Sequence, residues 1–154
     1  MRPTRIQWFM ELAQATAKRS TCCRLNVGAV VVVNRNPVSF GYNGRKAGKP
    51  HCEGNACPGR FLCQETVHAE MNAINRMPTG LGTVPPDLFT TDSPCILCCS
   101  AIFTRGIGRV FFSNPYRLTD HLFDLNKQGV SIFRVLPAGY VMDWITKEIV
   151  EFDV

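Results

Sequence analysis

Two short motifs carry side chains that could bind a metal ion and move protons. The first, "TVHAE", contains His68 and Glu70, and the second, "SPCILC", contains Cys95 and Cys98. One imidazole and two thiolates are three of the four ligands of a tetrahedral zinc site, which leaves one position open for water, as in catalytic sites. Zinc lowers the pKa of such a water to about 7, and a nearby carboxylate can then shuttle a proton to a substrate. The motifs therefore predict a catalytic zinc with Glu70 beside it.

Both motifs fall where helices are expected to begin. Residues 65–77 have a helical apolar period, and Pro94 can start a second helix. Cys95 and Cys98 then lie on neighbouring turns of that helix, where its positive end favours thiolates. H-x-E followed by P-C-x-x-C is the signature of zinc deaminases. The alternatives are a purely structural zinc or core cysteines that bind no metal.

The rest of the chain alternates helices with strands. Gly129 closes an amphipathic helix, and "GAVVVV" suits a central strand. This order predicts a single domain over residues 1–154, with a three-layer α/β/α arrangement around a mixed sheet. The predicted helices cover 6–20, 65–77, 95–105 and 118–129; the predicted strands cover 26–33, 38–44, 87–91, 109–113 and 130–135; and the tail, 138–152, is predicted as a strand followed by an edge helix.

Composition indicates an ordinary globular protein. The 154 residues are 45% hydrophobic and 19% charged, with eight cysteines and a formal net charge of +5. No apolar run is long enough to span a membrane, and the N-terminus does not resemble a signal peptide. We therefore expect a soluble, cytoplasmic protein without membrane contact, in which clustered cysteines bind metal rather than form disulfides. The positive charge fits an anionic substrate, weak nucleic-acid contact, or merely a soluble surface.

The chain resembles the cytidine deaminase superfamily and, within it, the deoxycytidylate (dCMP) deaminases. The matching blocks follow one another along nearly the whole chain: "RSTCCRLNVGAVVV", "GYNG", "HCEGNAC", "TVHAEMNAI", "SPCILC" and "GIGRVFFSNPYR". The resemblance implies a five-stranded sheet between helices and hydrolytic deamination of dCMP to dUMP, on the route to thymidylate. It also implies that His68, Cys95 and Cys98 hold the catalytic zinc. Zinc-bound hydroxide would attack C4 of cytosine while Glu70 shuttles protons.

One candidate substrate contact follows from the same resemblance, and the others are chosen because they lie near the matching blocks. Asn43, in "GYNG", matches an Asn that related deaminases use on the sugar, although an Asn there could instead permit a tight turn. Asn26 could face the base or could be a turn residue, and Tyr116 could border the nucleotide or cap the core. The candidates for a 5′-phosphate contact are basic residues near the motif blocks, namely Arg24, Arg45, Lys46 and Arg117.

A second, structural zinc is also expected. The resemblance places ligands at Cys22 and Cys52, and two further cysteines of the Cys-rich loop would complete a closed four-ligand site. The alternative is a set of free thiols. The predicted ligands are Cys22, Cys52, Cys57 and Cys63, with His51 in reserve.

The resemblance further suggests a homo-oligomer, a hexamer in related enzymes, that is often activated by dCTP and inhibited by dTTP. No nucleic-acid partner is expected. Two other kinds of function stay open at this point. One is deamination of a different substrate, such as a modified dCMP, a free base or a tRNA adenosine. The other is a non-catalytic zinc-binding module, against which the presence of Glu70 argues.

Overall fold

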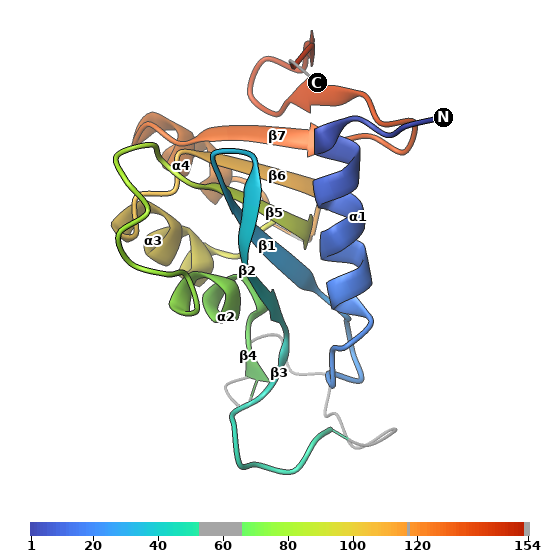
Figure 1. Ribbon diagram of the computed structural model, residues 1–154, viewed down its shortest axis with the longest axis vertical. Helices are drawn as coiled ribbons and strands as arrows, with labels where there is room; N and C mark the ends of the chain where they lie inside the picture. Colours follow the sequence, from blue (N-terminus) through green and yellow to red (C-terminus); the bar gives the residue numbers. More distant parts are fainter. Residues whose placement is uncertain (53–65, 117, 153–154) are drawn as a thin grey trace.

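Seven strands form one mixed sheet at the centre of the protein (Figure 1). The computed structural model describes residues 1–52, 66–116 and 118–152. The order across the sheet is β2 (Asn36–Tyr42), β1 (Gly28–Val33), β5 (Asp87–Asp92), β6 (Arg109–Asn114), β7 (Ser131–Val135), β8 (Val141–Asp143) and β9 (Ile149–Val150). The neighbouring strands β5, β6 and β7 run parallel, and the other pairs of the sheet are antiparallel.

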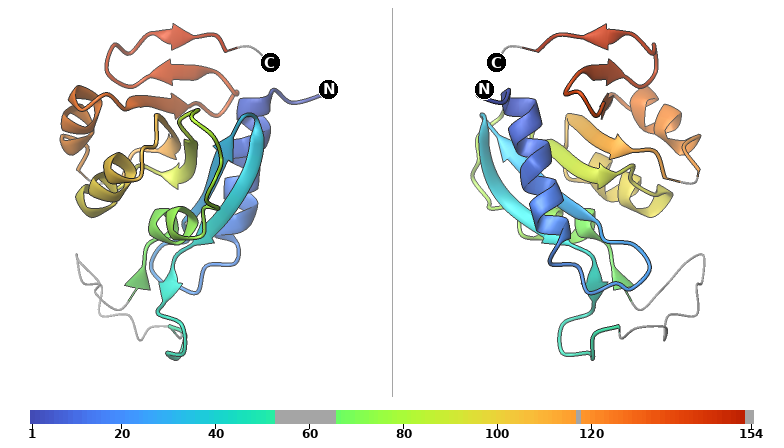
Figure 2. Two further views of the ribbon diagram at one scale, coloured as in Figure 1. Left: turned by 60° about the vertical axis from the view of Figure 1, so that its left-hand side comes forward. Right: turned by 90° about the vertical axis from the view of Figure 1, so that its right-hand side faces the viewer.

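Four helices among the described residues cover the two faces of this sheet, so the predicted three-layer fold is confirmed (Figures 1 and 2). One helix lies on one face and the others lie on the opposite face, as the contacts of the buried side chains show. In the described parts of the chain, no helix has the length and apolar character that crossing a bilayer requires. The helices are α1 (Arg5–Ala17), α2 (Ala69–Asn75), α3 (Ile96–Thr104) and α4 (His121–Lys127).

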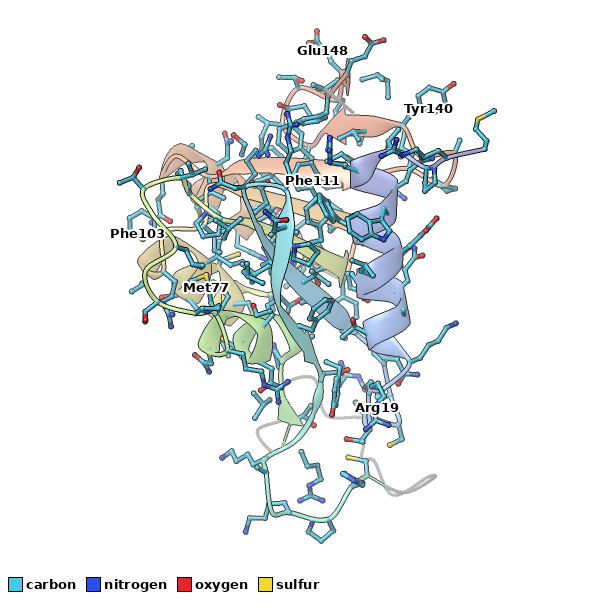
Figure 3. All side chains as sticks on the ribbon, in the orientation of Figure 1. Arg19, Met77, Phe103, Phe111, Tyr140 and Glu148 are labelled. Carbon is cyan, nitrogen blue, oxygen red and sulfur yellow. The ribbon has the colours of Figure 1, made fainter. Side chains whose placement is uncertain are left out.

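The face under α1 is packed with aromatic rings. Phe89 and Phe111 on adjacent parallel strands stack with their centroids 4.5 Å apart, and Phe133 on the next strand continues the stack at 5.0 Å. Phe9 of α1 meets Phe89 edge-on. Figure 3 shows Phe111 between the sheet and this helix. The opposite core, under α2, α3 and α4, is mainly aliphatic.

Two glycines allow helices to approach the sheet closely. A Cβ at Gly28 of β1 would lie 2.0 Å from the carbonyl oxygen of Ala13 in α1. A Cβ at Gly41 of β2 would lie 2.3 Å from the carbonyl oxygen of Ala69 in α2. Both separations are shorter than any real side chain tolerates, so each helix sits where only glycine can face it. Helix α2 is also tied to β2 by a hydrogen bond from the Ser39 hydroxyl to the carbonyl of Ala73 (2.7 Å).

Two predictions about the sheet were wrong. The expected five strands are extended to seven, and the expected edge helix in 138–152 is instead the hairpin of β8 and β9. The side chain of Asp143 accepts hydrogen bonds from the backbone N–H groups of Ile145 and Thr146, which favours a turn over a helix there. Lys147, with φ at 64°, completes the reversal of the chain.

A small second sheet pairs β3 (Gly44–Arg45) with β4 (Thr66–Val67). This pairing brings the end of the "GYNG" block beside the residues that lead into α2. Residue 45 and residue 66 are direct partners in the register.

Candidate metal centre

The first turns of α2 and α3 present the residues of the two chemical motifs. His68 is the N-cap of α2 and Cys95 the N-cap of α3, and both have extended backbone conformations. Among the described residues, neither side chain caps its own helix. Their side chains instead meet each other, although the residues are 27 positions apart.

His68, Cys95 and Cys98 come together at this place. The Nδ1 atom of His68 lies 3.3 Å from Sγ of Cys95 and 3.4 Å from Sγ of Cys98, and the ligand atoms of all three residues lie within 4.8 Å of one another. Zinc–ligand bonds of about 2.0 to 2.3 Å in a tetrahedron put neighbouring ligand atoms about 3.6 Å apart. The two short separations suit such a site, and a nitrogen with two sulfurs is a donor set that zinc prefers.

Glu70 lies beside these three residues and is buried, with 5% of its surface exposed. Its Oε1 atom accepts a hydrogen bond from the Thr90 hydroxyl at 3.0 Å, and its Oε2 atom lies 3.4 Å from Sγ of Cys98. Burial raises the pKa of the Glu70 carboxyl, opposed by its own backbone N–H, by His68 and by Thr90. A raised carboxyl pKa suits a group that must take up and release protons near neutral pH.

The two cysteines have different proton affinities because they share a hydrogen bond. Cys98 stabilises the thiolate of Cys95 through this hydrogen bond. The bond and the neighbouring His68 together lower the pKa of Cys95 to about 3. The same pairing, together with burial, raises the pKa of Cys98.

The turn that leads into α3 is held by three hydrogen bonds. The backbone N–H of Ser93 donates to the carbonyl of Asn114 (2.9 Å), and the backbone N–H of Tyr116 donates to the Ser93 hydroxyl (2.7 Å). Nε2 of His121, at the start of α4, donates to the carbonyl of Pro94 at 2.7 Å. The position of Cys95 is thus fixed by residues at the end of β6 and beyond it.

A family model of a zinc-binding region matches the part of the chain that contains this site. Residues 3–114 match the model of the cytidine and deoxycytidylate deaminase zinc-binding region. The chain belongs to this deaminase family. The family predicted from the motifs is therefore confirmed, and the His68, Cys95 and Cys98 group is consistent with a zinc site in this chain.

Individual relatives match most of the chain. ComE operon protein 2 of Bacillus subtilis is 36% identical over 149 residues, which are 95% of this chain and 79% of that protein. The deoxycytidylate deaminase of Schizosaccharomyces pombe is 30% identical over 88% of this chain, which spans only 45% of that longer protein. The crystal structure of the dCMP deaminase from cyanophage S-TIM5 in complex with dCMP and dUMP superposes with a TM-score of 0.76 and 31% identity, covering 87% of this chain and 98% of that one.

Two residues predicted to contact the deaminase substrate meet each other. Nη2 of Arg24 donates to the hydroxyl of Tyr116 at 2.7 Å, across 92 positions of sequence. Because Tyr116 also bonds Ser93, this pair adjoins the turn that carries Cys95. The other candidates are placed as follows: Asn26 and Lys46 are exposed, Arg45 is half-buried on β3, and Arg117 lies outside the described residues.

Asn43 is buried and is largely committed to the protein. Its side-chain oxygen accepts from the backbone N–H of Val27 (2.9 Å) and from the Ser20 hydroxyl, and its amide nitrogen donates to the carbonyl of Leu25 (2.7 Å). These bonds tie the segment after α1 to the end of β2. The contact between Asn43 and a sugar hydroxyl stays a prediction, and it would have to use the second amide hydrogen.

The second zinc site also stays a prediction. Cys22 and Cys52 are half-buried and His51 is exposed, whereas Cys57 and Cys63 lie outside the described residues. Within the part of the chain that the structure describes, the three-residue group of His68, Cys95 and Cys98 is the one potential metal cluster.

Thr90 and His121 lie outside the two motifs, so neither was predicted, yet both contact residues of the site from other elements. Thr90 is fully buried on a central strand between Phe89 and Thr91. A buried hydroxyl requires a hydrogen-bond partner, so its place in an apolar strand was a usable signal. His121 is one of only three histidines in the chain, but its link to Pro94 depends on how α4 packs, which no local pattern reveals.

Proposed function

We propose that this protein catalyses the hydrolytic deamination of dCMP to dUMP and ammonia. The observation that carries this proposal is the buried Glu70 carboxylate directly beside the His68, Cys95 and Cys98 donors. A structural zinc site has no use for such a carboxylate, because structural sites are closed by four protein ligands. The nucleotide is inferred from the cyanophage relative, whose structure contains dCMP and dUMP.

The chain supplies metal binding and proton transfer in this reaction. His68, Cys95 and Cys98 would hold zinc, which when bound acts as a Lewis acid and lowers the pKa of water to about 7. Glu70 takes a proton from the attacking water and delivers it to N3 of the cytosine ring. It then takes the proton of the new C4 hydroxyl and passes it to the departing amino group. The C4–O bond forms and the bond between C4 and the exocyclic nitrogen breaks, so one water is consumed and one ammonia is released.

Arg24 is our proposed contact for the 5′-phosphate. Guanidinium groups bind phosphate through charge-assisted hydrogen bonds, and the bond to the Tyr116 hydroxyl holds Arg24 next to the turn before Cys95. Arg24→Ala should raise KM for dCMP about tenfold or more, the scale of one hydrogen bond to a charged group. Arg76→Ala removes the same charge at the far end of α2 and is the matched control. Equal effects of the two variants would reject Arg24.

Ammonia release from a panel of substrates tests the proposed reaction. The panel contains dCMP, CMP, deoxycytidine, cytosine, 5-substituted dCMPs and an RNA hairpin with a target adenosine. We expect dCMP or a 5-substituted dCMP to be turned over with the highest kcat/KM. Equal turnover of deoxycytidine and dCMP would contradict the nucleotide assignment. Activity confined to the hairpin would favour a tRNA deaminase.

We also propose that copies of this chain associate with one another, and that each chain binds a second zinc, whose test is given below. On α3, the side chains of Ile96, Leu97 and Phe103 are 65%, 64% and 50% exposed, and Figure 3 shows Phe103 on the outer side of the molecule. Exposed apolar residues on one helix support an interface between copies. Sedimentation should give a species larger than a monomer, with Leu97→Asp shifting it toward the monomer. Addition of dCTP and dTTP to the assay tests regulation.

Elemental analysis tests the metal count. Two zinc ions per chain are expected, and Cys63→Ser should retain about one together with part of the activity. A single zinc in carefully prepared unmodified protein would refute the second site.

A further inference from the structure

The orientation of the Glu70 carboxylate depends on the groups around it. The last side-chain torsion of a glutamate has a broad distribution of preferred angles, so neighbouring groups set the plane of the carboxylate. In this structure the two oxygens have different neighbours: Oε1 faces the hydroxyl of Thr90, and Oε2 faces Cys98 among the metal ligands. A carboxylate that works as a proton shuttle needs one oxygen turned toward the reacting water.

Thr90 is well suited to fix this orientation. It lies in β5, which is paired on both sides by β1 and β6, and its surface is fully buried. Its hydroxyl lies 3.0 Å from Oε1 of Glu70 and 3.1 Å from the carbonyl oxygen of Asp92. Hydroxyl and carboxylate are both enclosed, so loss of the hydroxyl leaves a buried carboxylate oxygen without this donor.

We propose that Thr90 is a positioning residue for Glu70, whose hydroxyl holds Oε1 so that Oε2 is presented to the metal centre. The inference rests on the proposed function, because it assigns Thr90 a part in the same proton transfer. A misplacement of about 1 Å at a reacting group can cost about a hundredfold in rate. Thr90 acts through Glu70 and touches no substrate in this role.

The neighbouring Thr91 provides a matched control. Successive residues of a strand point to opposite faces, and Thr91 faces the α1 side. Its hydroxyl accepts from the backbone N–H of Gly28 (3.2 Å) and donates to the Asp92 carboxylate (2.9 Å). Thr91→Val therefore removes the same hydroxyl from the same buried strand without touching Glu70.

The test compares Thr90→Val, Thr90→Ser and Thr91→Val, all loaded with zinc, on the panel substrate that the unmodified protein turns over best. Thr90→Val should lower kcat about ten- to a hundredfold with little change in KM. Thr90→Ser keeps the hydroxyl and should restore most of kcat, and Thr91→Val should lower the melting temperature but not kcat. An unchanged kcat in Thr90→Val would overturn the proposal, as would a loss in Thr90→Ser as deep as in Thr90→Val.

A second readout does not depend on turnover. Thr90→Val should change the melting temperature in the unmodified protein and much less in a Glu70→Ala background, because the contact is already absent there. Equal shifts in both backgrounds would overturn the proposal even if dCMP proved to be the wrong substrate. Lack of turnover on the whole panel, together with a clear difference between the two backgrounds, would instead reject the proposed function and leave the Glu70–Thr90 contact established.

Discussion

The face of the sheet covered by α1 and the face covered by α2 and α3 differ in what they bury. Under α1, the rings of Phe89, Phe111 and Phe133 stack across three parallel strands. On the other face the core is aliphatic, and at its edge it encloses the polar side chains of Glu70 and Thr90. Substitutions on the α1 face should therefore change stability alone, whereas substitutions on the α2 and α3 face should also change catalysis.

On both faces, a glycine allows a helix to pack closely against the sheet. Gly28 admits α1 and Gly41 admits α2, each through contact with backbone atoms of the helix. Of these two helices, only α2 carries residues of the metal centre, because His68 is its N-cap and Glu70 lies in its first turn. Matched substitutions on the two faces can therefore separate folding from function.

The largest effect is expected from Glu70→Ala. This variant should keep its zinc, because Glu70 is not one of the three donors, but lose at least about 10²- to 10⁴-fold in kcat, the range for a general acid–base group. Zinc content by elemental analysis and kcat are measured on the same sample. Near-normal turnover by a folded, zinc-loaded variant would exclude Glu70 as the proton shuttle.

Gly41→Ala and Gly28→Ala form the most direct test of the comparison. Each introduces a methyl group against helix backbone, and overpacking of this kind costs about 1 to 3 kcal/mol of unfolding free energy. Gly41→Ala should also lower kcat, because it displaces the helix that carries His68 and Glu70. Gly28→Ala should leave kcat per folded molecule close to normal. Equal losses of kcat in the two variants would show that the faces are not separable.

A smaller effect is expected from His121→Phe. The ring is kept, but the hydrogen bond to the carbonyl of Pro94 is lost, at a net cost of about 1 kcal/mol. Because that bond fixes the turn before Cys95, the variant should lose zinc to a chelator faster than the unmodified protein. Phe123→Leu, an exposed change in the same helix, is the control. Identical rates of zinc release would assign His121 to general packing of α4.

The smallest functional effect is expected from Phe111→Leu. Loss of the ring leaves a cavity in the aromatic stack, which should lower the unfolding free energy by roughly 1 to 3 kcal/mol. Chemical denaturation measures this loss, and kcat below the melting transition should be unchanged. A drop in kcat at a temperature where the variant is fully folded would mean that the α1 face also controls the site.

Local patterns predicted most of the fold because several signals agreed. The buried run of β1 and the helical stripe of α1 were both found, and the capping box formed by Thr4 and Gln7 marks the start of α1 more accurately than the stripe did. The end of α1 was predicted too late, because the Ser20 hydroxyl donates to the carbonyl of Asn43, which lies between β2 and β3, far along the chain. The β8–β9 hairpin was missed for a similar reason, since the turn depends on one aspartate side chain.

The residues of the site also divide into those that local patterns reveal and those that depend on contacts between distant elements. His68, Glu70, Cys95 and Cys98 could be found because metal chemistry restricts the residue types and a helix turn restricts their spacing. The partners of Thr90 and His121 and the Arg24–Tyr116 contact could not, because each pairs residues from separate elements. Nothing in the local sequence requires a threonine under Glu70. Its partner is known only once β5 and α2 are packed together.

The β8–β9 hairpin, which lies where a helix was predicted, forms one edge of the sheet and affects whether other chains can pair with that edge. Exposed strand edges invite pairing between chains and, from there, aggregation. The last strand, β9, offers only two residues for such pairing, and the exposed charged side chains of Lys147, Glu148 and Glu151 flank it. A seven-residue strand, β2, forms the opposite margin. Intermolecular strand addition is therefore disfavoured at β9, and any tendency toward it should concentrate at β2.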